Sequence, residues 1–382
     1  MDQLTKGDPS MKTTISAHFA EIQEPRMERT KLHPLINIIT IALCAIISGA
    51  DDWVAIEAYG RTKAEFLGTF LDLTNGIPSH DTFRRVFGLL DPEQFQAQFL
   101  SWVQSIEQLT QGEVVAIDGK RLRGSRQSTK GAINVVSAWA TQNRLVLGQR
   151  KVDDKSNEIT AIPELLELLH LKGCIVTIDA LGCQQAIAST IIEQEADYLL
   201  SLKGNQPELR RAVSEYFEAV LDPKQKMTNF TYLRTVDAAH GRIETRQHWI
   251  TEDISWLPAA TGKALWPGLR SLGMIQAQRR IGAQTSRFVR YYLSSLPPDV
   301  HQFAHAARAH WLIENQLHWS LDVTFHEDAN RTRTDCAPQN LAIVRHIALN
   351  LLQQERSTKD SLKVKRLRAA WDHEYLLKLL SI

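Results

Sequence analysis

The chain has 382 residues, which is too long for one ordinary hydrophobic core, so two or three domains are expected. Hydrophobic residues make up 43% and charged residues 23% of the chain, which fits a globular protein and excludes a disordered one. The net charge of +1 gives no overall signature of nucleic-acid binding. The four cysteines match no zinc-binding spacing. With no signal peptide and no apolar run long enough for a bilayer, these features predict a cytoplasmic protein with reduced thiols and no membrane partner.

Positive charge is concentrated locally, although the whole chain is nearly neutral. No acidic residue interrupts the basic run from Lys120 to Lys130, or the five arginines between Arg270 and Arg290. Residues 331–382 contain ten Lys/Arg and five Asp/Glu. Such patches suit a protein that binds a polyanion on one face, and ordinary solvated surface charge is the alternative for each of them.

The first part of the chain has a helical pattern. Residues 1–30 are polar and are expected to be partly disordered, whereas residues 31–110 are expected to form a helical domain. Its helices are predicted at 35–48, 51–66, 82–90 and 92–109, with Ser79-His80-Asp81 capping the third. A helix-turn-helix interpretation places Arg84 and Arg85 of that third helix against DNA, and simple helical packing is the alternative.

Short β-prone runs begin after Gly112. Strands are predicted at 114–117, 133–140, 144–152, 174–178 and 198–203, with helices at 157–169 and 184–195. In the resulting order β-β-β-α-β-α-β, the first three strands pair as hairpins and the later strands arrive through helical crossovers, which favours parallel pairing. This is the order of the ribonuclease H-like fold, a mixed α/β sheet with flanking helices, and residues 111–203 are expected to form its first part.

The alternation of helix and strand stops in residues 204–295. Predicted strands at 230–236, 243–250 and 287–296 indicate a β-rich insertion. Helices resume at about residue 301, so residues 296–382 are expected to complete the core and to end in a basic tail. That tail includes Lys363, Lys365, Arg366 and Arg368, which are expected either to bind phosphates or to be solvated.

Three carboxylates are candidates for one site. Asp118 and Asp179 each follow a predicted strand, and if these strands are parallel neighbours both side chains reach the sheet edge where ligands collect. Glu314 lies at the centre of a half-apolar helix face, where burying an unpaired carboxylate costs several kcal/mol or so. A divalent cation shared with the two aspartates would offset that cost. The structural alternatives are turn roles for the aspartates and pairing of Glu314 with Arg308 or a histidine.

Converging carboxylates suit Mg²⁺, which takes oxygen ligands and keeps waters that substrate phosphates displace. Two such ions about 4 Å apart activate the attacking oxygen and stabilise the leaving oxygen in phosphoryl transfer. The three carboxylates therefore predict a site for two Mg²⁺ ions, in which Mn²⁺ can substitute.

Several segments carry a recognisable family pattern. Residues 116–120 (AIDGK), 176–180 (VTIDA) and 310–315 (HWLIEN) resemble the three catalytic motifs of the H-repeat-associated, ISAs-type DDE transposases. The resemblance continues through the blocks 76–83, 154–160, 202–206, 240–246 and 317–323 and spans residues 25–355. It implies a ribonuclease H-like core and an insertion before the third carboxylate. It also implies that Asp118, Asp179 and Glu314 bind metal and catalyse DNA cleavage at insertion-sequence ends and strand transfer into target DNA.

The resemblance also implies partners. These are double-stranded DNA, both the inverted-repeat ends and the target, and a second copy of the chain in the DNA complex, on the bacterial nucleoid. Many related transposases place a tyrosine, an arginine and a lysine around the glutamate, where this chain has Ala307, His310 and Leu321. His310 lies one turn before Glu314, which makes it a candidate phosphate contact.

Residues beside the predicted site are candidates for DNA contacts, with solvated loop charge or local structural roles as the alternative. They are Lys120, Arg121 and Arg123 after the first aspartate, Lys203 and Asn205 after the last core strand, and Arg242 in the insertion. Asp322, Glu327 and Asp328 are possible substitutes for Glu314. A transposase-derived DNA-binding protein without catalysis is the alternative function, and a structure-specific nuclease on the same fold is a third.

Overall fold

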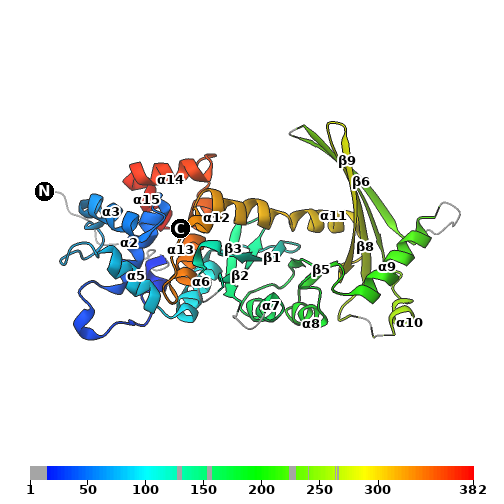
Figure 1. The fold of residues 1–382 in the computed structure, drawn as a ribbon, viewed down its shortest axis with the longest axis horizontal. Helices are drawn as coiled ribbons and strands as arrows, with labels where there is room; N and C mark the ends of the chain where they lie inside the picture. The colour runs from blue at the N-terminus through cyan, green and yellow to red at the C-terminus, as the bar shows by residue number, and fades with distance from the viewer. Residues whose placement is uncertain are drawn as a thin grey trace.

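The computed structural model describes residues 15–126, 131–152, 157–222, 229–239, 241–262, 264 and 266–382. Helices of the N-terminal part lie at one end of an elongated molecule, the strands of the insertion lie at the other, and the core sheet lies between them (Figure 1). Within the described ranges, no helix combines the length and the apolar character that crossing a membrane requires.

The N-terminal helices follow the predicted pattern closely. They are α1 (Ile15–Phe19), the 3₁₀ turn η2 (Glu28–Thr30), α2 (Leu35–Ile47), α3 (Trp53–Thr62), α4 (Ala64–Leu67), α5 (His80–Leu89) and α6 (Pro92–Ile106). The side chains of Asp52, Ser79 and Asp91 cap α3, α5 and α6 by accepting hydrogen bonds from backbone amides of the first turn. The second predicted helix is wrong in one respect, because the chain breaks it at Lys63 into α3 and α4.

The core sheet has the predicted strand order. Its elements are β1 (Val114–Arg121), the 3₁₀ turn η3 (Arg123–Ser125), β2 (Asn134–Ala140), β3 (Leu145–Lys151), α7 (Glu158–Glu167), β4 (Ile175–Ile178), α8 (Gln185–Glu193) and β5 (Asp197–Leu202). The strands lie in the order β3-β2-β1-β4-β5. β1 pairs antiparallel with β2 and parallel with β4, and β4 pairs parallel with β5. This confirms the expected ribonuclease H-like, mixed α/β core.

One predicted strand end is wrong. β1 does not stop before Asp118 but continues to Arg121, because Asp118 to Arg121 pair with Ser137 to Asn134 of β2. On its other side, β1 pairs with β4 only as far as Ile117 opposite Ile178. The next residue of each strand is therefore an aspartate, and this register sets Asp118 beside Asp179.

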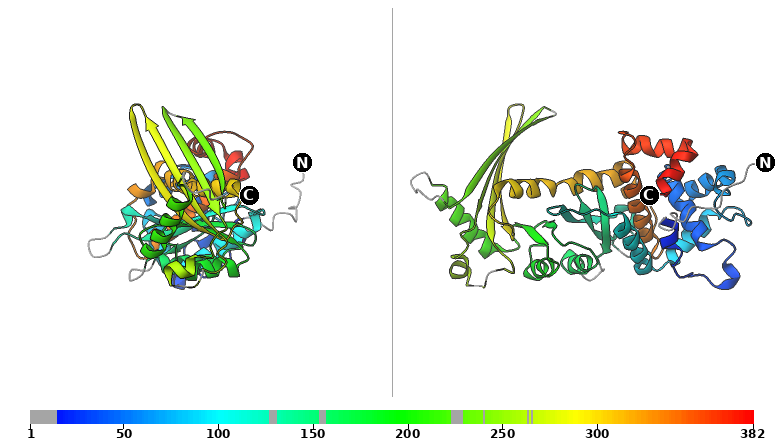
Figure 2. Two further views of the ribbon diagram at one scale, coloured as in Figure 1. Left: turned by 90° about the vertical axis from the view of Figure 1, so that its right-hand side faces the viewer. Right: turned by 180° about the vertical axis from the view of Figure 1, so that it is seen from behind.

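The insertion extends the core sheet instead of forming a sheet of its own. It contains α9 (Pro207–Val220), β6 (Thr231–Ala239), β7 (Arg242–Thr251), α10 (Leu257–Thr261), β8 (Ser271–Ile281) and β9 (Gln284–Ser294). β9 pairs antiparallel with β5, and β8, β7 and β6 follow, giving one nine-stranded sheet. We call strands β6–β9 the blade, because their hairpin ends stand away from the body of the molecule (Figure 2). The sequence interpretation missed β8 and α9.

The C-terminal part returns from the blade to the helical end. It comprises α11 (Val300–Ala309), the π-helical turn η4 (Ile313–His318), α12 (Trp319–Val323), the 3₁₀ turn η5 (Glu327–Ala329), α13 (Ala337–Gln354), α14 (Leu362–Trp371) and α15 (His373–Leu380). α13 is buried along most of its length. It joins the N-terminal helices and the core into one continuous hydrophobic cluster, so the helical part shares its core with the sheet. The domain boundaries drawn from the sequence stay predictions.

Two of the four basic residues predicted for the tail are buried, whereas Lys363 is exposed and Arg368 pairs with Asp360 at 3.0 Å. Lys365 is buried and its ammonium donates to the carbonyl of Leu352 at 2.9 Å. Arg366 is also buried and donates to the carbonyl of Ile46 at 2.7 Å and to the carboxylate of Asp51 at 3.2 Å. These two residues fasten α14 to the neighbouring helices, so neither is available to a DNA phosphate. A cation in this position satisfies the carbonyls at the end of α2, which favours positive charge.

Candidate active site

Asp118, Asp179 and Glu314 line one cavity of about 330 Å³. Asp118 comes from the middle of β1, Asp179 from the residue after β4, and Glu314 from the π-helical turn that follows α11. The floor of the cavity is formed by β4, β5 and β9, and the segment from Ala307 to Glu314 covers one side. The fold thus brings together three carboxylates that are far apart in the sequence.

Within the described ranges, Asp118, Glu314 and His318 form a group that could hold a metal ion, each offering a ligand atom within 4.8 Å of the others. The His318 Nδ1 lies 3.1 Å from a Glu314 oxygen and 3.6 Å from an Asp118 oxygen. Asp179 shares the cavity, and one of its oxygens accepts a hydrogen bond from the amide of Leu181 at 2.9 Å. Carboxylate oxygens with an imidazole nitrogen form a suitable donor set for a divalent cation.

The sequence interpretation missed His318. It follows Glu314 by four residues, which places the two side chains one turn apart on a helix, and this spacing was a usable signal. Its side chain is only 6% exposed. Burial lowers the pKa of His318, and the hydrogen bond from its Nδ1 to the Glu314 carboxylate opposes that shift.

The helix argument for Glu314 was wrong in its geometry. The chain does not form one continuous α-helix through this residue but widens into the π-helical turn η4. The Glu314 side chain is 63% exposed, so no cost of burial requires a cation. The extra residue of the π turn instead directs Glu314 toward the cavity, and π turns of this kind are frequent at functional sites.

Negative charge accumulates around Asp118. Burial raises the pKa of its carboxyl to about 7, opposed by a hydrogen bond from the Gly119 amide. The neighbouring negative charges of Asp179, Glu158 and Glu314 raise this pKa further. Like charges held together in this way favour a bound cation, because a cation offsets their repulsion.

Glu158 is a fourth carboxylate that the sequence interpretation did not identify. It occupies the first turn of α7, directly after the capping residue Asn157. Its carboxylate lies against Gly119, where a Cβ atom would come within 2.1 Å of a Glu158 oxygen. Burial and the charge of Asp179 raise the pKa of Glu158. Gly119 therefore lets this carboxylate approach β1 beside Asp118.

Known families match this chain along most of its length. A family model described as "Transposase DDE domain" matches residues 109–351, and one described as "DDE_Tnp_1-associated" matches residues 16–103. The chain belongs to the DDE transposase family. This confirms the resemblance seen in the three motifs, and the matched domain contains all three carboxylates of the transposase.

Relatives of the transposase carry related names. It is 41% identical over 369 residues to "Putative transposase YncI" of Escherichia coli O157:H7, covering 95% of this chain and 93% of that protein. It is 40% identical over 375 residues to "H repeat-associated putative transposase YhhI" of Escherichia coli K12, covering 96% and 97%. A third relative, "Inactive transposase YbfQ" of Escherichia coli K12, is 41% identical over 72 residues, covering 19% and 86%.

Lys120, predicted to contact DNA, lies in a cluster of acidic side chains. Its ammonium lies 2.6 Å from Asp322, 3.0 Å from Glu327 and 3.4 Å from Asp328, and its side chain is 10% exposed. Burial alone would lower the pKa of Lys120, but Glu327 and Asp322 outweigh it and raise the pKa above its ordinary value. These three acids therefore hold Lys120 of the transposase, which also removes them as substitutes for Glu314.

Four other predicted arginine contacts lie at the surface of the transposase. Arg121 is exposed at the end of β1, and Arg123 is 79% exposed with its guanidinium 3.3 Å from Asp328. Arg84 and Arg85 are exposed on α5, where Arg84 pairs with Asp81 at 2.9 Å. Exposure leaves all four accessible to DNA, and their DNA contacts stay predictions.

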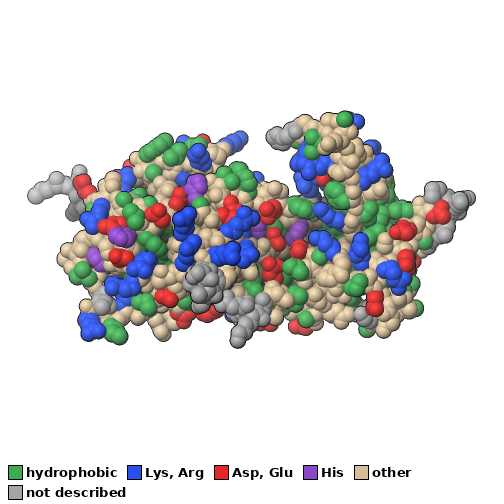
Figure 3. Space-filling model, viewed as in Figure 1, with side chains coloured by type: hydrophobic (Ala, Val, Ile, Leu, Met, Phe, Trp, Pro, Cys, Tyr) green, Lys and Arg blue, Asp and Glu red, His purple; other side chains and the backbone are tan. Residues whose placement is uncertain are grey.

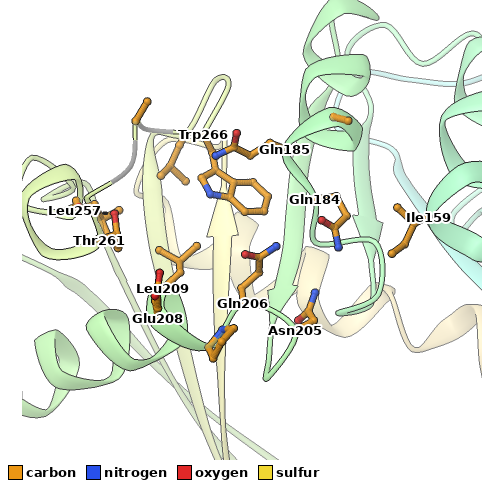
Figure 4. A pocket seen from close by; sticks show the side chains of 14 residues that line it. Ile159, Gln184, Gln185, Asn205, Gln206, Glu208, Leu209, Leu257, Thr261 and Trp266 are labelled. Carbon is orange, nitrogen blue, oxygen red and sulfur yellow. Dashed lines mark hydrogen bonds between the residues drawn. The ribbon is translucent and has the colours of Figure 1, made fainter.

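The two predicted contacts that follow β5, Lys203 and Asn205, face different cavities. The exposed Lys203 lines the carboxylate cavity, as expected. Asn205 does not, because its amide donates to the carbonyl of Ala180 and its side chain faces another cavity of about 710 Å³. Figure 4 shows that Gln184, Gln185 and Gln206 point into that second cavity. Asn205 is thus a structural residue of this loop.

His310 is half-buried beside the site and has a neutral ring. Its Nδ1 lies 3.1 Å from the hydroxyl of Thr177 on β4. Burial lowers the pKa of His310 to about 4, opposed by the charge of Asp179. A neutral, hydrogen-bonded imidazole is a poor phosphate anchor, so the predicted phosphate contact is not supported. Its contact with Thr177 instead fixes the end of α11 against β4.

Proposed function

We propose that this transposase is catalytically active, hydrolyses a phosphodiester at each insertion-sequence end and joins the freed 3′-hydroxyl to target DNA. One observation supports this most strongly. The register of β1 and β4 sets Asp118 beside Asp179, and the π turn brings Glu314 into the same cavity. Three carboxylates in one open cavity suit metal-assisted phosphoryl transfer.

A divalent cation fits the donor set of this cavity. Asp118, Glu314 and Asp179 would hold it through oxygens, with His318 as a further ligand or as the residue that orients the two nearest carboxylates. The raised pKa of Asp118 supports this fit, because it reflects neighbouring negative charge that a cation would offset. When bound, two Mg²⁺ ions, or Mn²⁺ in their place, supply activation of the attacking oxygen and stabilisation of the leaving oxygen.

Other residues around the cavity would contact the phosphates and position the wall beside Asp179. Lys203 and Arg290 line it and offer positive charge to the phosphates beside the scissile bond. The neutral His310 and Thr177 hold the wall next to Asp179. The partner is double-stranded DNA, as inverted-repeat end and as target. Joining two ends to one target favours a homodimer on the DNA.

Cleavage of labelled inverted-repeat DNA in Mg²⁺ tests the proposal. Asp118→Asn, Asp179→Asn and Glu314→Gln should each abolish cleavage, while the matched surface change Glu167→Gln on α7 should leave it intact. If any of the three variants cuts as fast as the parent, that residue is not part of the site. Strand joining is scored on a target plasmid, where cleavage without joining would indicate a nuclease.

The second candidate is a DNA-binding protein that no longer catalyses. It is favoured by the name of one relative, "Inactive transposase YbfQ". The presence of all three carboxylates in one cavity weighs against this candidate. A parent protein that binds end DNA but neither cuts nor joins it in Mg²⁺ or Mn²⁺ would establish the second candidate instead.

A further inference from the structure

A positively charged groove lies between the blade and α11. We call it the arginine groove; it is a hollow of about 300 Å³ lined by Arg242, Arg246, Arg279, Arg290, Arg308 and Trp311. Glu244 is the single acid in its lining. Figure 3 shows Lys and Arg side chains gathered on the blade and at its junction with the body, close to a group of acidic side chains.

Strand geometry explains why these arginines share one face. Side chains alternate between the faces of a sheet, so Arg279 and Arg290 point to the α11 side, while Arg280 and Arg287 point to the other. The register agrees, since Arg279 pairs with Glu244 of β7 and Arg290 pairs with Ile275 of β8, all of them groove residues. The acid-free arginine run in the sequence therefore divides between two faces.

The helix α11 covers only the part of this face nearest the core. The Phe303 ring packs on Gly273, where a Cβ atom would lie 2.5 Å from it. Phe303 is fully buried. Farther out along the strands, no helix of the described ranges covers the face, and the guanidinium groups line an open groove. The close contact at Gly273 thus fixes where the arginine groove begins.

Most of the positive charge in the groove is not neutralised within the chain. Arg246 is paired with Asp237 and Glu244. In the described part of the chain, Arg279, Arg290 and Arg308 form no salt bridge, and the buried Nε of Arg279 has no hydrogen-bond partner. The guanidinium groups without an acidic partner are therefore available to pair with an anionic ligand.

The groove is continuous with the carboxylate cavity. Arg290, Tyr292, Ala307 and Trp311 line both. The guanidinium of Arg290 lies over the Trp311 ring at 4.7 Å, and Trp311 is 41% exposed. Because Trp311 precedes Glu314 by only three residues, a base stacked on it would lie beside the site. Nucleic-acid strands are often held by such a combination of cations and an aromatic face.

We propose that the arginine groove binds a single DNA strand, with its phosphates on the arginines and a base on Trp311, and leads that strand to the carboxylates. This inference rests on the proposed function for the choice of DNA as ligand. Stacking on Trp311 requires an unpaired base, and the bases of a duplex are paired and stacked on one another. A single strand offers both a narrow backbone and exposed bases.

Fluorescence anisotropy of the full-length protein without metal tests the inference. The probe is a fluorescein-labelled oligothymidylate of about 12 nucleotides, which is within the usual range for one binding groove. Arg279→Ala/Arg290→Ala should weaken binding at least tenfold or so and should reduce the slope of log affinity against log salt by about 1.4. Arg280→Ala/Arg287→Ala removes the same charge from the opposite face of the same strands and should leave both values unchanged. Trp311→Ala should cost roughly 5- to 100-fold, and Trp311→Phe much less.

Two results would contradict the proposal that the arginine groove binds a single DNA strand. One is an equal loss in the groove pair and the opposite-face pair, and the other is groove-dependent binding of a duplex but not of oligothymidylate. Failure of the proposed function looks different, because binding is measured without metal and cleavage is measured separately. If the parent cuts end DNA and the groove variants bind oligothymidylate normally, the groove proposal is contradicted and the proposed catalytic function is supported. If the groove variants lose binding but the parent never cuts end DNA, the groove proposal is supported and the proposed catalytic function is contradicted.

Discussion

Two cationic regions flank the same carboxylates. The positive charge of one is paired with acids, and most of the positive charge of the other is not. On one side, Lys120 is buried among three acids, the nearest only 2.6 Å away. On the other, Arg279 and Arg290 of the arginine groove form no salt bridge within the described residues. Lys120 lies two residues from Asp118 in the sequence, whereas the groove arginines lie more than a hundred away. Nearness to a site residue in sequence is therefore a poor guide to which cation is free to meet DNA.

The acids of the carboxylate cavity and those around Lys120 should also differ, and this difference gives the largest expected effect. Asp118→Asn should lower Mg²⁺-dependent cleavage by about 10³-fold or more, since it removes a metal-binding oxygen. It should not lower stability, because it removes a carboxylate whose pKa is raised by burial and by neighbouring negative charge. Glu327→Gln should instead lower stability, because it removes a buried acid that is paired with Lys120. Cleavage assays paired with denaturant unfolding check both; a destabilised Asp118→Asn would contradict the account.

The Lys120 cluster can be tested by removing its cation. Lys120→Met leaves the buried Glu327 without its closest partner and should cost about 3–5 kcal/mol of unfolding free energy. The exposed neighbour Arg121 provides the control, and Arg121→Met should change stability by less than about 0.5 kcal/mol. Urea unfolding measures both. A stable Lys120→Met protein with weakened DNA binding would restore the role predicted from sequence.

A second buried acid tests whether such pairing governs stability elsewhere. Burial raises the pKa of Glu355, but hydrogen bonds from Ser357 and Lys378 outweigh it and lower the pKa to about 2. Its contribution is therefore present above the unfolded value of about 4.5 and is lost as pH falls from there through about 2. Glu355→Gln should cost up to about 3 kcal/mol at neutral pH and should flatten the loss of stability in acid. Unfolding free energies measured at pH 7 and across this acidic range check it, and an unchanged acid profile would contradict it.

His318 gives the smallest expected effect. If it orients or ligates at the site, His318→Leu should weaken Mn²⁺ binding by about 10- to 100-fold. His318→Asn keeps a polar atom near the Nδ1 position and should retain part of that affinity. His305→Leu, an exposed change on α11, serves as the control. Mn²⁺ titration by electron paramagnetic resonance measures all three, and equal affinities would exclude His318 from the site.

The parts of the fold that follow from short-range pattern were predictable. Each core strand is a brief apolar run and α7 carries its own cap at Asn157, so the order β-β-β-α-β-α-β could be predicted, and with it the pairing of β1 and β4. β8 was missed because Gly273 and a mixture of polar and apolar residues obscure its alternation. The continuation of the core sheet into the blade depends on the pairing of β5 with β9, which no local pattern indicates.

The site was only partly predictable for the same reason. Asp118 and Asp179 follow from strand order, but the partners of Lys120 lie about two hundred residues away and no neighbouring sequence indicates them. The exposure of Glu314 depends on a π turn, which has no strong sequence signal. The exposure of Trp311 could not be predicted either, because apolar periodicity does not distinguish a buried ring from one that faces a groove.

The pairing of β9 with β5 has a mechanical consequence. Four residue pairs connect β9 to β5, so the blade continues the core sheet and is not joined to it through a linker. Its reach is set by the length of its hairpins. Because side chains alternate, a hairpin can lengthen or shorten without turning its arginines to the wrong face only by an even number of residues per strand, about 7 Å for each two. We expect relatives with a different reach to DNA to differ by such even steps.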